Sequence, residues 1–312
     1  MFKSTFSSSR FEPAPNRILF EVPDHESLSA TNTVMDLHFH SCYSDGADPP
    51  EKIAEKARSL GIGIAITDHN AIDGALAIDR YKNLLSIPGI EVTSKQGAHV
   101  LVYFYEARAL QFFFEKEIEP FLGRDRMSSI GLSMEEIVRR AGVYEALVIF
   151  PHPYCAMYTG ICNPIFSPER QRDLLAMADG VEVINAGNVK KWNLKCALLG
   201  FNLNKAITGG SDGHSIEQMG KSVTYAPVAA DRIAFLEALR KGENRVIGKE
   251  LNLVRKVAAN GVKVPSSIDH SSNIMEKNMR YGYAVLNKKT RQVKVNMRRR
   301  LNNRRLRKSA FS

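Results

Sequence analysis

The stretch "MDLHFHSCYSDGADPP", residues 35–50, places two histidines two positions apart on a short apolar run and then adds acidic residues. In an extended strand, side chains at positions i and i+2 point to the same face. His38 and His40 therefore converge on one side, whereas Leu37 and Phe39 face the other. Two converging imidazoles suit a metal ion better than they suit a hydrophobic core.

The overall composition is that of an ordinary globular protein. The 312 residues are 44% hydrophobic and 24% charged. No apolar run reaches the roughly 18–20 residues of a membrane span, and the N-terminus lacks the roughly 7–15-residue apolar segment of a signal peptide. The four cysteines show no C-x-x-C spacing. We therefore expect a cytoplasmic protein with reduced thiols and no membrane partner.

The charge is divided unevenly along the chain and predicts its domain organisation. Residues 1–250 carry 27 Lys and Arg against 31 Asp and Glu, whereas residues 251–312 carry 16 against 2. We predict an N-terminal extension over residues 1–33, a mildly acidic main domain over residues 34–250, and a basic, partly disordered extension over residues 251–312.

From residue 34 onward, short apolar runs alternate with helical patterns. The run "DPPEKIAEKARSLG", residues 48–61, predicts a helix with Asp48 as a candidate N-cap and proline in its first turn. Because the apolar runs are continuous, they favour an α/β fold with a mostly parallel sheet covered by helices. Periodicity alone leaves open whether six or seven such strands form a barrel or an open sheet.

Polar side chains gather at the ends of these predicted strands. In parallel β/α architectures the strand ends share one face, so groups nearly 180 residues apart can converge there. Only His25 and His270 among the eight histidines fall outside this pattern. The clustered residues are His38, His40, Asp45, Asp68, His69, Glu91, His99, His152, Asp212 and His214.

This donor set points to a metal centre with more than one ion. Imidazole and carboxylate ligands without a thiolate suit Zn²⁺, Mn²⁺ or Fe²⁺. The residues exceed the needs of one ion, so two or three ions that share a bridging carboxylate are the economical arrangement. Glu91, in the middle of the series, is the best bridging candidate. Such clusters bind phosphate oxygens and activate water near neutral pH.

The segments "DLHFHSCYSDG", "AITDHN", "GIEV", "FPHP" and "GSDGH" resemble the successive motifs of the PHP (polymerase and histidinol phosphatase) family, over residues 34–250. The resemblance implies a distorted barrel of about seven βα units, a (β/α)7 barrel, with a trinuclear metal site and phosphoesterase activity. Asp45 stands where many members have histidine, which resembles the nucleotide and oligonucleotide phosphoesterase branch. The implied ligands are His38, His40, Asp45, His69, Glu91, His99, His152, Asp212 and His214.

The mechanism implied by the resemblance is hydrolysis of a phosphate ester by a metal-activated hydroxide. Asp68, Glu91 and His214 are the residues expected to take part in catalysis. For Asp68 two roles stay open, because this aspartate could orient a neighbouring ligand or cap a helix.

The sequence therefore predicts an enzyme, a phosphatase or nuclease acting on a nucleotide, an oligonucleotide or a small phosphorylated metabolite. Two alternatives stay open: a non-catalytic protein that binds metal and nucleic acid, and a hydrolase of C–N bonds on a similar barrel. The eleven Lys and Arg between Lys288 and Lys308 are either a solubilising tail or a site for nucleic acid.

Overall fold

The computed structural model describes residues 17–251. The first 16 residues of the predicted N-terminal extension lie outside the described residues. Residues 252–312 of the predicted basic extension also lie outside the described residues. They include the candidate nucleic-acid site between Lys288 and Lys308.

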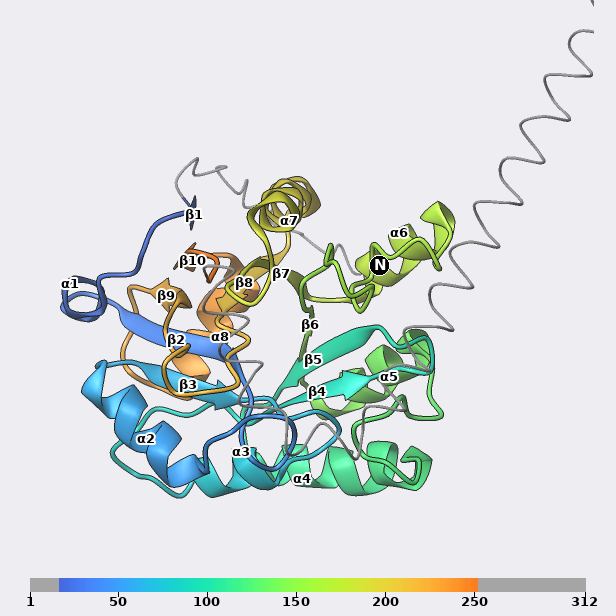
Figure 1. Cartoon of the computed structure of the whole chain (residues 1–312), viewed down its shortest axis with the longest axis horizontal. Helices are drawn as coiled ribbons and strands as arrows, with labels where there is room; N and C mark the ends of the chain where they lie inside the picture. The colour runs from blue at the N-terminus through green and yellow to red at the C-terminus, as the bar shows by residue number, and fades with distance from the viewer. Residues whose placement is uncertain (1–16, 252–312) are drawn as a thin grey trace, which may run out of the picture.

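In residues 17–251 the strands form two five-stranded sheets (Figure 1). The first has the order β1 (Ile18–Leu19), β10 (Arg245–Gly248), β9 (Ser222–Ala226), β2 (Thr33–Phe39) and β3 (Gly63–Ile66). The second has the order β4 (Gly89–Thr93), β5 (His99–Tyr103), β6 (Leu147–Phe150), β7 (Gly180–Asn185) and β8 (Ala206–Gly210).

Helices lie around the outside of the two sheets, with α2 beside β3 and α7 beside β7 (Figure 1). No helix within residues 17–251 combines the length and the apolar character needed to cross a bilayer. The helices are α1 (His25–Ser29), α2 (Pro50–Ser59), α3 (Asp73–Ile78), α4 (Ala107–Phe113), α5 (Met134–Ala141), α6 (Pro168–Met177), α7 (Lys190–Leu203) and α8 (Arg232–Lys241). Shorter turns of π- or 3-10-helix cover η1 (Phe114–Ile118), η2 (Glu119–Phe121) and η3 (Gly142–Tyr144).

Local sequence signals explain where most helices begin. Ser133 caps α5 in a capping box with Glu136, and Ser167 caps α6 ahead of a proline. The predicted helix over residues 48–61 is α2, but Asp48 is not its cap. Pro49 occupies the N-cap position, and the Asp48 carboxylate accepts a hydrogen bond from the backbone N–H of Ile216 instead.

The strand pairing is mixed, which corrects the expectation of a mostly parallel sheet. Half of the strand pairs are parallel and half are antiparallel. The short turn between β4 and β5, residues 94–98, permits only antiparallel pairing. The apolar runs are continuous because these strands are buried on both faces. Antiparallel strands that are buried on both faces have the same continuous apolar sequence as parallel ones.

The described residues form a mixed α/β fold in which the two sheets do not close into one hydrogen-bonded barrel. The sheets nevertheless meet along one edge. Backbone N–H groups of Asp212 and His40 donate to His38 and Gly213, which joins the end of β2 to the segment after β8. A bridge between His69 and Glu91 joins the segment after β3 to β4. The polar residues at the ends of these strands therefore lie close together at this edge.

A buried tyrosine links the two sheets in the core. Tyr103 of β5 is wholly buried, and its hydroxyl donates a 2.7 Å hydrogen bond to the carbonyl of Leu37 in β2. Leu37 directly precedes His38, so this bond fixes the strand that carries the first two predicted ligands.

We expect Tyr103→Phe to lower the free energy of unfolding by about 1–3 kcal/mol, because the change leaves a buried carbonyl without this donor while it keeps the ring. Denaturant unfolding followed by circular dichroism measures the effect. As a control, Tyr43→Phe alters an exposed ring and should change stability by less than about 0.5 kcal/mol. Equal effects of the two substitutions would contradict this role of Tyr103.

Candidate metal centre

The first two histidines of the site lie at the end of β2, as their spacing predicts. Every residue of β2 is buried. His38 and His40 are wholly buried, and the centroids of their rings lie 5.2 Å apart. An alternating pattern of this kind in a buried strand places both imidazoles on one side and leaves Leu37 and Phe39 to the apolar core.

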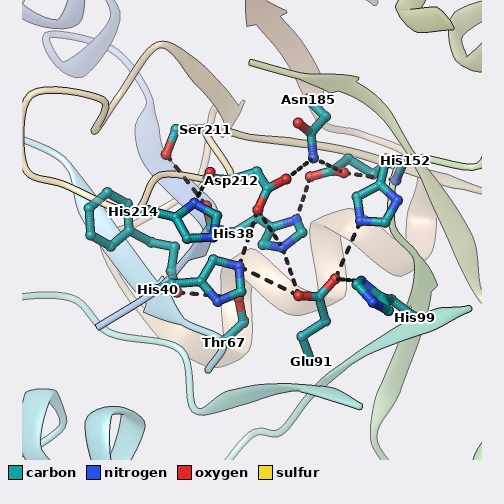
Figure 2. A network of polar contacts seen from close by, with 12 residues as sticks. His38, His40, Thr67, Glu91, His99, His152, Asn185, Ser211, Asp212 and His214 are labelled. Carbon is teal, nitrogen blue, oxygen red and sulfur yellow. Dashed lines mark hydrogen bonds and ion pairs between the residues drawn. The ribbon is translucent and has the colours of Figure 1, made fainter. Parts of the chain in front are cut away.

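The carboxylate of Glu91 contacts imidazoles through both of its oxygens (Figure 2). Glu91 is only 1% exposed, and both of its oxygens face imidazoles. The Oε2 atom lies 3.4 Å from His38 Nε2, 3.5 Å from His40 Nε2 and 3.1 Å from His69 Nδ1. The Oε1 atom lies 2.8 Å from His99 Nδ1 and 3.4 Å from His152 Nε2. One carboxylate thus separates two groups of imidazoles, which is the geometry of a bridge.

Two aspartates complete the cluster through contacts with its imidazoles. Asp212 Oδ1 lies 3.4 Å from His38 Nε2 and 3.1 Å from His40 Nε2. Asp45 Oδ2 lies 2.9 Å from His214 Nε2, and Asp45 Oδ1 lies 3.6 Å from His40 Nδ1. His40 is therefore shared between the two carboxylates, and Asp45, which the sequence places in a loop, reaches the same cluster.

The hydrogen bonds of His214 show that this arrangement calls for a cation. His214 Nδ1 lies 2.9 Å from the carbonyl oxygen of Asp212, so Nδ1 must carry the donated proton. In a neutral ring Nε2 then presents a lone pair to the carboxylate of Asp45. A lone pair and a carboxylate oxygen at this distance repel each other unless a proton or a metal ion lies between them.

The ionisation of the buried groups follows from the same crowding. Burial opposes the charged form of Glu91, but His99, His69 and His38 outweigh it and hold the pKa of this carboxyl well below its usual range. Burial likewise opposes the charged form of His38, yet Asp212, Glu182 and Glu91 raise the pKa of this imidazole well above its usual value. For His69 burial dominates and lowers the pKa to about 3. The carboxylates thus stay ionised and attract positive charge.

The donors form overlapping groups, each of which could hold a metal ion. Within residues 17–251, three groups of side chains have ligand atoms within 4.8 Å of one another. His40 belongs to two of these groups and His69 to two, so the groups form one continuous cluster. Four buried ring nitrogens have no hydrogen-bond partner within the described residues: His38 Nε2, His40 Nδ1, His69 Nδ1 and His152 Nδ1. The groups are His38 with His40 and Asp212, His40 with Asp45 and His69, and His69 with Glu91 and His99.

Two residues of the cluster adopt left-handed backbone conformations that are uncommon outside glycine. His152 has φ of 31° and Asp212 has φ of 49°. Each such residue costs on the order of 1 kcal/mol or more and persists where its surroundings hold it. The backbone N–H of His152 donates to Glu182, and that of Asp212 donates to the carbonyl of His38. These bonds hold both side chains toward the cluster.

The structure places the nine predicted ligands around one pocket of about 490 Å³. Seven of them line it, and His38 and His40, which are fully buried, contact the lining residues Glu91 and Asp212. Asp68 lies apart from the pocket lining. Its carboxylate accepts hydrogen bonds from the backbone and hydroxyl of Ser41 and from the hydroxyl of Ser44. It is also not a helix cap, since α3 begins at Asp73 after Ile72.

His99 reaches the pocket for a different reason from the one expected. It is the first residue of β5 and not the end of a strand. Because β5 runs antiparallel to β4, its start lies beside the end of β4, opposite Thr93. The opposite strand direction therefore delivers a ligand to the same edge of the sheet.

The sequence analysis missed three buried polar residues that support the ligands. Glu182 Oε1 lies 3.0 Å from His38 Nδ1, and Glu182 Oε2 accepts hydrogen bonds from Asn185 and from the backbone of His152. Asp36 accepts from the backbone of Ser211 and Gly220, and burial raises its pKa to about 6. A single charged residue inside an apolar strand, as in "GVEVIN" or "VMDLHF", was the signal that could have found Glu182 and Asp36.

Two family models match the chain. One, described as PHP domain, matches residues 36–141, and the other, described as PHP-associated, matches residues 192–244. An uncharacterized protein of Methanocaldococcus jannaschii is 30% identical over 163 residues, which cover 48% of this chain and 81% of that protein. The error-prone DNA polymerase of Mycobacterium tuberculosis is 38% identical over 60 residues, only 6% of the polymerase.

Solved structures share the fold at low sequence identity. A lesion-specific endonuclease Q from Pyrococcus furiosus is 18% identical with a TM-score of 0.54, and the match covers 69% of this chain and 57% of that one. The structure of an endonuclease Q in complex with a 27-mer duplex that carries an abasic lesion is 17% identical with a TM-score of 0.56. This match covers 70% of this chain and 60% of that one. A two-domain protein from Bacteroides vulgatus, described as containing a predicted PHP-like metal-dependent phosphoesterase, is 20% identical with a TM-score of 0.50. This match covers 76% of this chain and 72% of that one.

We expect Glu182→Gln to weaken metal retention about tenfold or more, because it removes the charge that holds His38 Nδ1 as a donor and turns Nε2 toward the cluster. Titration of the metal-free protein in metal-buffered solution measures this. The control Glu55→Gln removes an exposed carboxylate on α2 and should leave affinity unchanged. If Glu182→Gln bound metal as tightly as the control, Glu182 would have no part in orienting His38.

Proposed function

The chain belongs to the PHP domain family, and we propose that it is a metal-dependent phosphoesterase with a di- or trinuclear metal centre. One observation carries the proposal. The buried carboxylate of Glu91 faces five imidazoles from four parts of the chain, with three at one oxygen and two at the other. Buried charge on this scale is costly unless cations balance it.

The residues that would hold the ions lie around Glu91, and the carboxylate of Glu91 would contribute an oxygen to ions on either side. Zn²⁺, Mn²⁺ and Fe²⁺ are the ions that this set of nitrogen and oxygen donors suits. The proposed ligands are His38, His40, Asp45, His69, Glu91, His99, His152, Asp212 and His214.

Bound divalent ions would neutralise phosphate oxygens and lower the pKa of a water molecule toward neutrality. The protein's own groups position this chemistry. Glu91 and His214 would contribute to the reaction as ligands that hold the metal ions in place. Asp68 acts indirectly, since it accepts hydrogen bonds from Ser41 and Ser44 and so holds the loop that carries Asp45. The amide of Asn185 donates to Asp212 and fixes that carboxylate.

We propose a phosphate ester of a nucleotide, an oligonucleotide or a small phosphorylated metabolite as the substrate. Asp45 stands where many family members have histidine, as in the nucleotide and oligonucleotide phosphoesterase branch, and this supports a nucleotide or an oligonucleotide. The fold shared with an endonuclease in complex with a lesion-containing duplex supports the same two substrates. The alternatives, hydrolysis of C–N bonds and a binding protein without catalysis, lack a comparable observation.

Elemental analysis of untagged protein, paired with a phosphate-release screen, tests the proposal. We expect at least two transition-metal ions per chain, and we expect a chelator to abolish hydrolysis until metal is restored. Glu91→Gln keeps the shape but loses the bridging charge, so it should lose metal and lower kcat/KM by about 100-fold or more. Glu55→Gln serves again as the control.

Three results would contradict the proposal. One ion or none at full occupancy would exclude the multinuclear centre. Activity on amides or lactams with none on phosphate esters would indicate a C–N hydrolase. Binding of nucleic acid without hydrolysis of any ester would indicate an accessory protein.

We also propose that the basic segment beyond residue 251 binds nucleic acid phosphates. Its charge supports this, with 16 Lys and Arg against 2 acidic residues over residues 251–312. Replacing Arg298, Arg299 and Arg300 by Gln should reduce the slope of log affinity against log salt by about 2 for a single strand. An unchanged slope would indicate that these arginines do not contact phosphates.

A further inference from the structure

Two aromatic rings and two lysines form a surface cluster beside the pocket. The rings of Tyr154 and Trp192 are nearly parallel, with an angle of 4° and a centroid distance of 6.5 Å. Lys195 Nζ lies 4.7 Å from the Trp192 ring centroid and 5.4 Å from that of Tyr154. Lys191 Nζ lies 5.6 Å from the Trp192 ring centroid. We call these four residues the aromatic–lysine cluster.

The aromatic–lysine cluster is continuous with the wall of the metal pocket. Tyr154 directly precedes Cys155, which lines the pocket. The backbone N–H of Trp192 donates to the carbonyl of Val189, another lining residue. The side chain of Asn188, also in the wall, donates to the carbonyl of Tyr154 and ties the two segments together.

Buried amides hold this cluster in a fixed position relative to the metal ligands. Asn193, the neighbour of Trp192 in α7, is wholly buried. Its side chain donates to the carbonyl of Asn185 and accepts from the backbone N–H of the same residue. Asn185 in turn donates to Asp212. A short chain of hydrogen bonds therefore runs from the aromatic–lysine cluster to a proposed metal ligand.

The two lysines supply positive charge that the pocket lining lacks. The pocket is lined by acidic, imidazole, amide and apolar side chains with one thiol and one hydroxyl, and no Lys or Arg takes part. Neither Lys191 nor Lys195 forms an ion pair with a carboxylate in residues 17–251. Their charges are therefore not neutralised by a neighbour and are open to an anion.

Aromatic rings beside cationic side chains are the combination that binds single nucleotides and single strands. A base stacks on the ring, and an ammonium group contacts the adjoining phosphate. A sugar phosphate without a base would gain nothing from the rings. Apolar groups at the same rim, the exposed side chains of Met157 and Val189, extend the surface that a flat ring can cover.

We propose that the aromatic–lysine cluster is a base-stacking subsite for a nucleotide whose phosphate ester is hydrolysed at the metal centre. The inference rests on the proposed function and makes its substrate class specific. Trp192 stacks on the base, Tyr154 supports Trp192, and Lys191 and Lys195 contact a second phosphate where the substrate has one.

The single tryptophan of the chain allows a direct test, because its fluorescence reports on Trp192 alone. The metal-loaded full-length protein is titrated with adenosine 5′-monophosphate and, separately, with ribose 5-phosphate, with excitation where adenine does not absorb. We expect saturable quenching by the nucleotide and none by the sugar phosphate. Equal responses to both, or no response to the nucleotide, would overturn the proposal.

Kinetics with the same two compounds supply the second readout. Trp192→Ala should raise KM for the nucleotide about tenfold and leave KM for ribose 5-phosphate unchanged, because only the nucleotide stacks. Trp192→Phe retains a ring and should preserve most of the nucleotide affinity. Leu198→Ala, at an exposed position on the same helix, is the matched control and should change neither value. A tenfold rise for both substrates with Trp192→Ala would indicate a structural role and overturn the proposal.

The two readouts separate this inference from the proposed function. Hydrolysis of both compounds without selective quenching would leave the phosphoesterase in place and remove the subsite. Selective quenching without hydrolysis of any phosphate ester would retain the subsite and remove the proposed reaction.

Discussion

The burial of one negative charge among imidazoles is the constraint on which the rest of this structure depends. Glu91 is 1% exposed, and a carboxylate in such a place is stable only if positive charge surrounds it. Five imidazoles from four separate segments face it, since His38 and His40 share one segment, and several of them hold its pKa well below the usual range. Because these segments lie far apart in the chain, the fold must bring their ends together, and the backbone bonds between the two sheets do so at this edge.

The same constraint explains features that are otherwise costly. The left-handed backbone at His152 and Asp212 turns both side chains toward the cluster. Hydrogen bonds that their backbone N–H groups donate to Glu182 and to the carbonyl of His38 maintain this conformation. Mixed strand pairing also brings a side chain to the cluster, since His99 is the first residue of β5, which runs antiparallel to β4. The fold therefore does not need a continuous parallel barrel to gather its ligands at one site.

The sequence allowed much of the site to be predicted, because ligand spacing is a local signal. The i, i+2 spacing of His38 and His40 fixed their common side, and polar residues after apolar runs indicated a shared edge. Supporting residues were harder to find. Glu182 lies in the middle of a strand, and its partners His38 and Asn185 are known only once the strands are placed. Strand direction was also missed, since buried strands read as continuously apolar in either orientation.

Anomalous scattering from crystals of the metal-loaded protein tests the central claim most directly. Data collected at the absorption edges of zinc, manganese and iron locate each ion and identify it. The account predicts two or three peaks within coordinating distance of the named imidazoles, with the carboxylate of Glu91 between two of them. A single peak, or peaks that Glu91 does not contact, would contradict it.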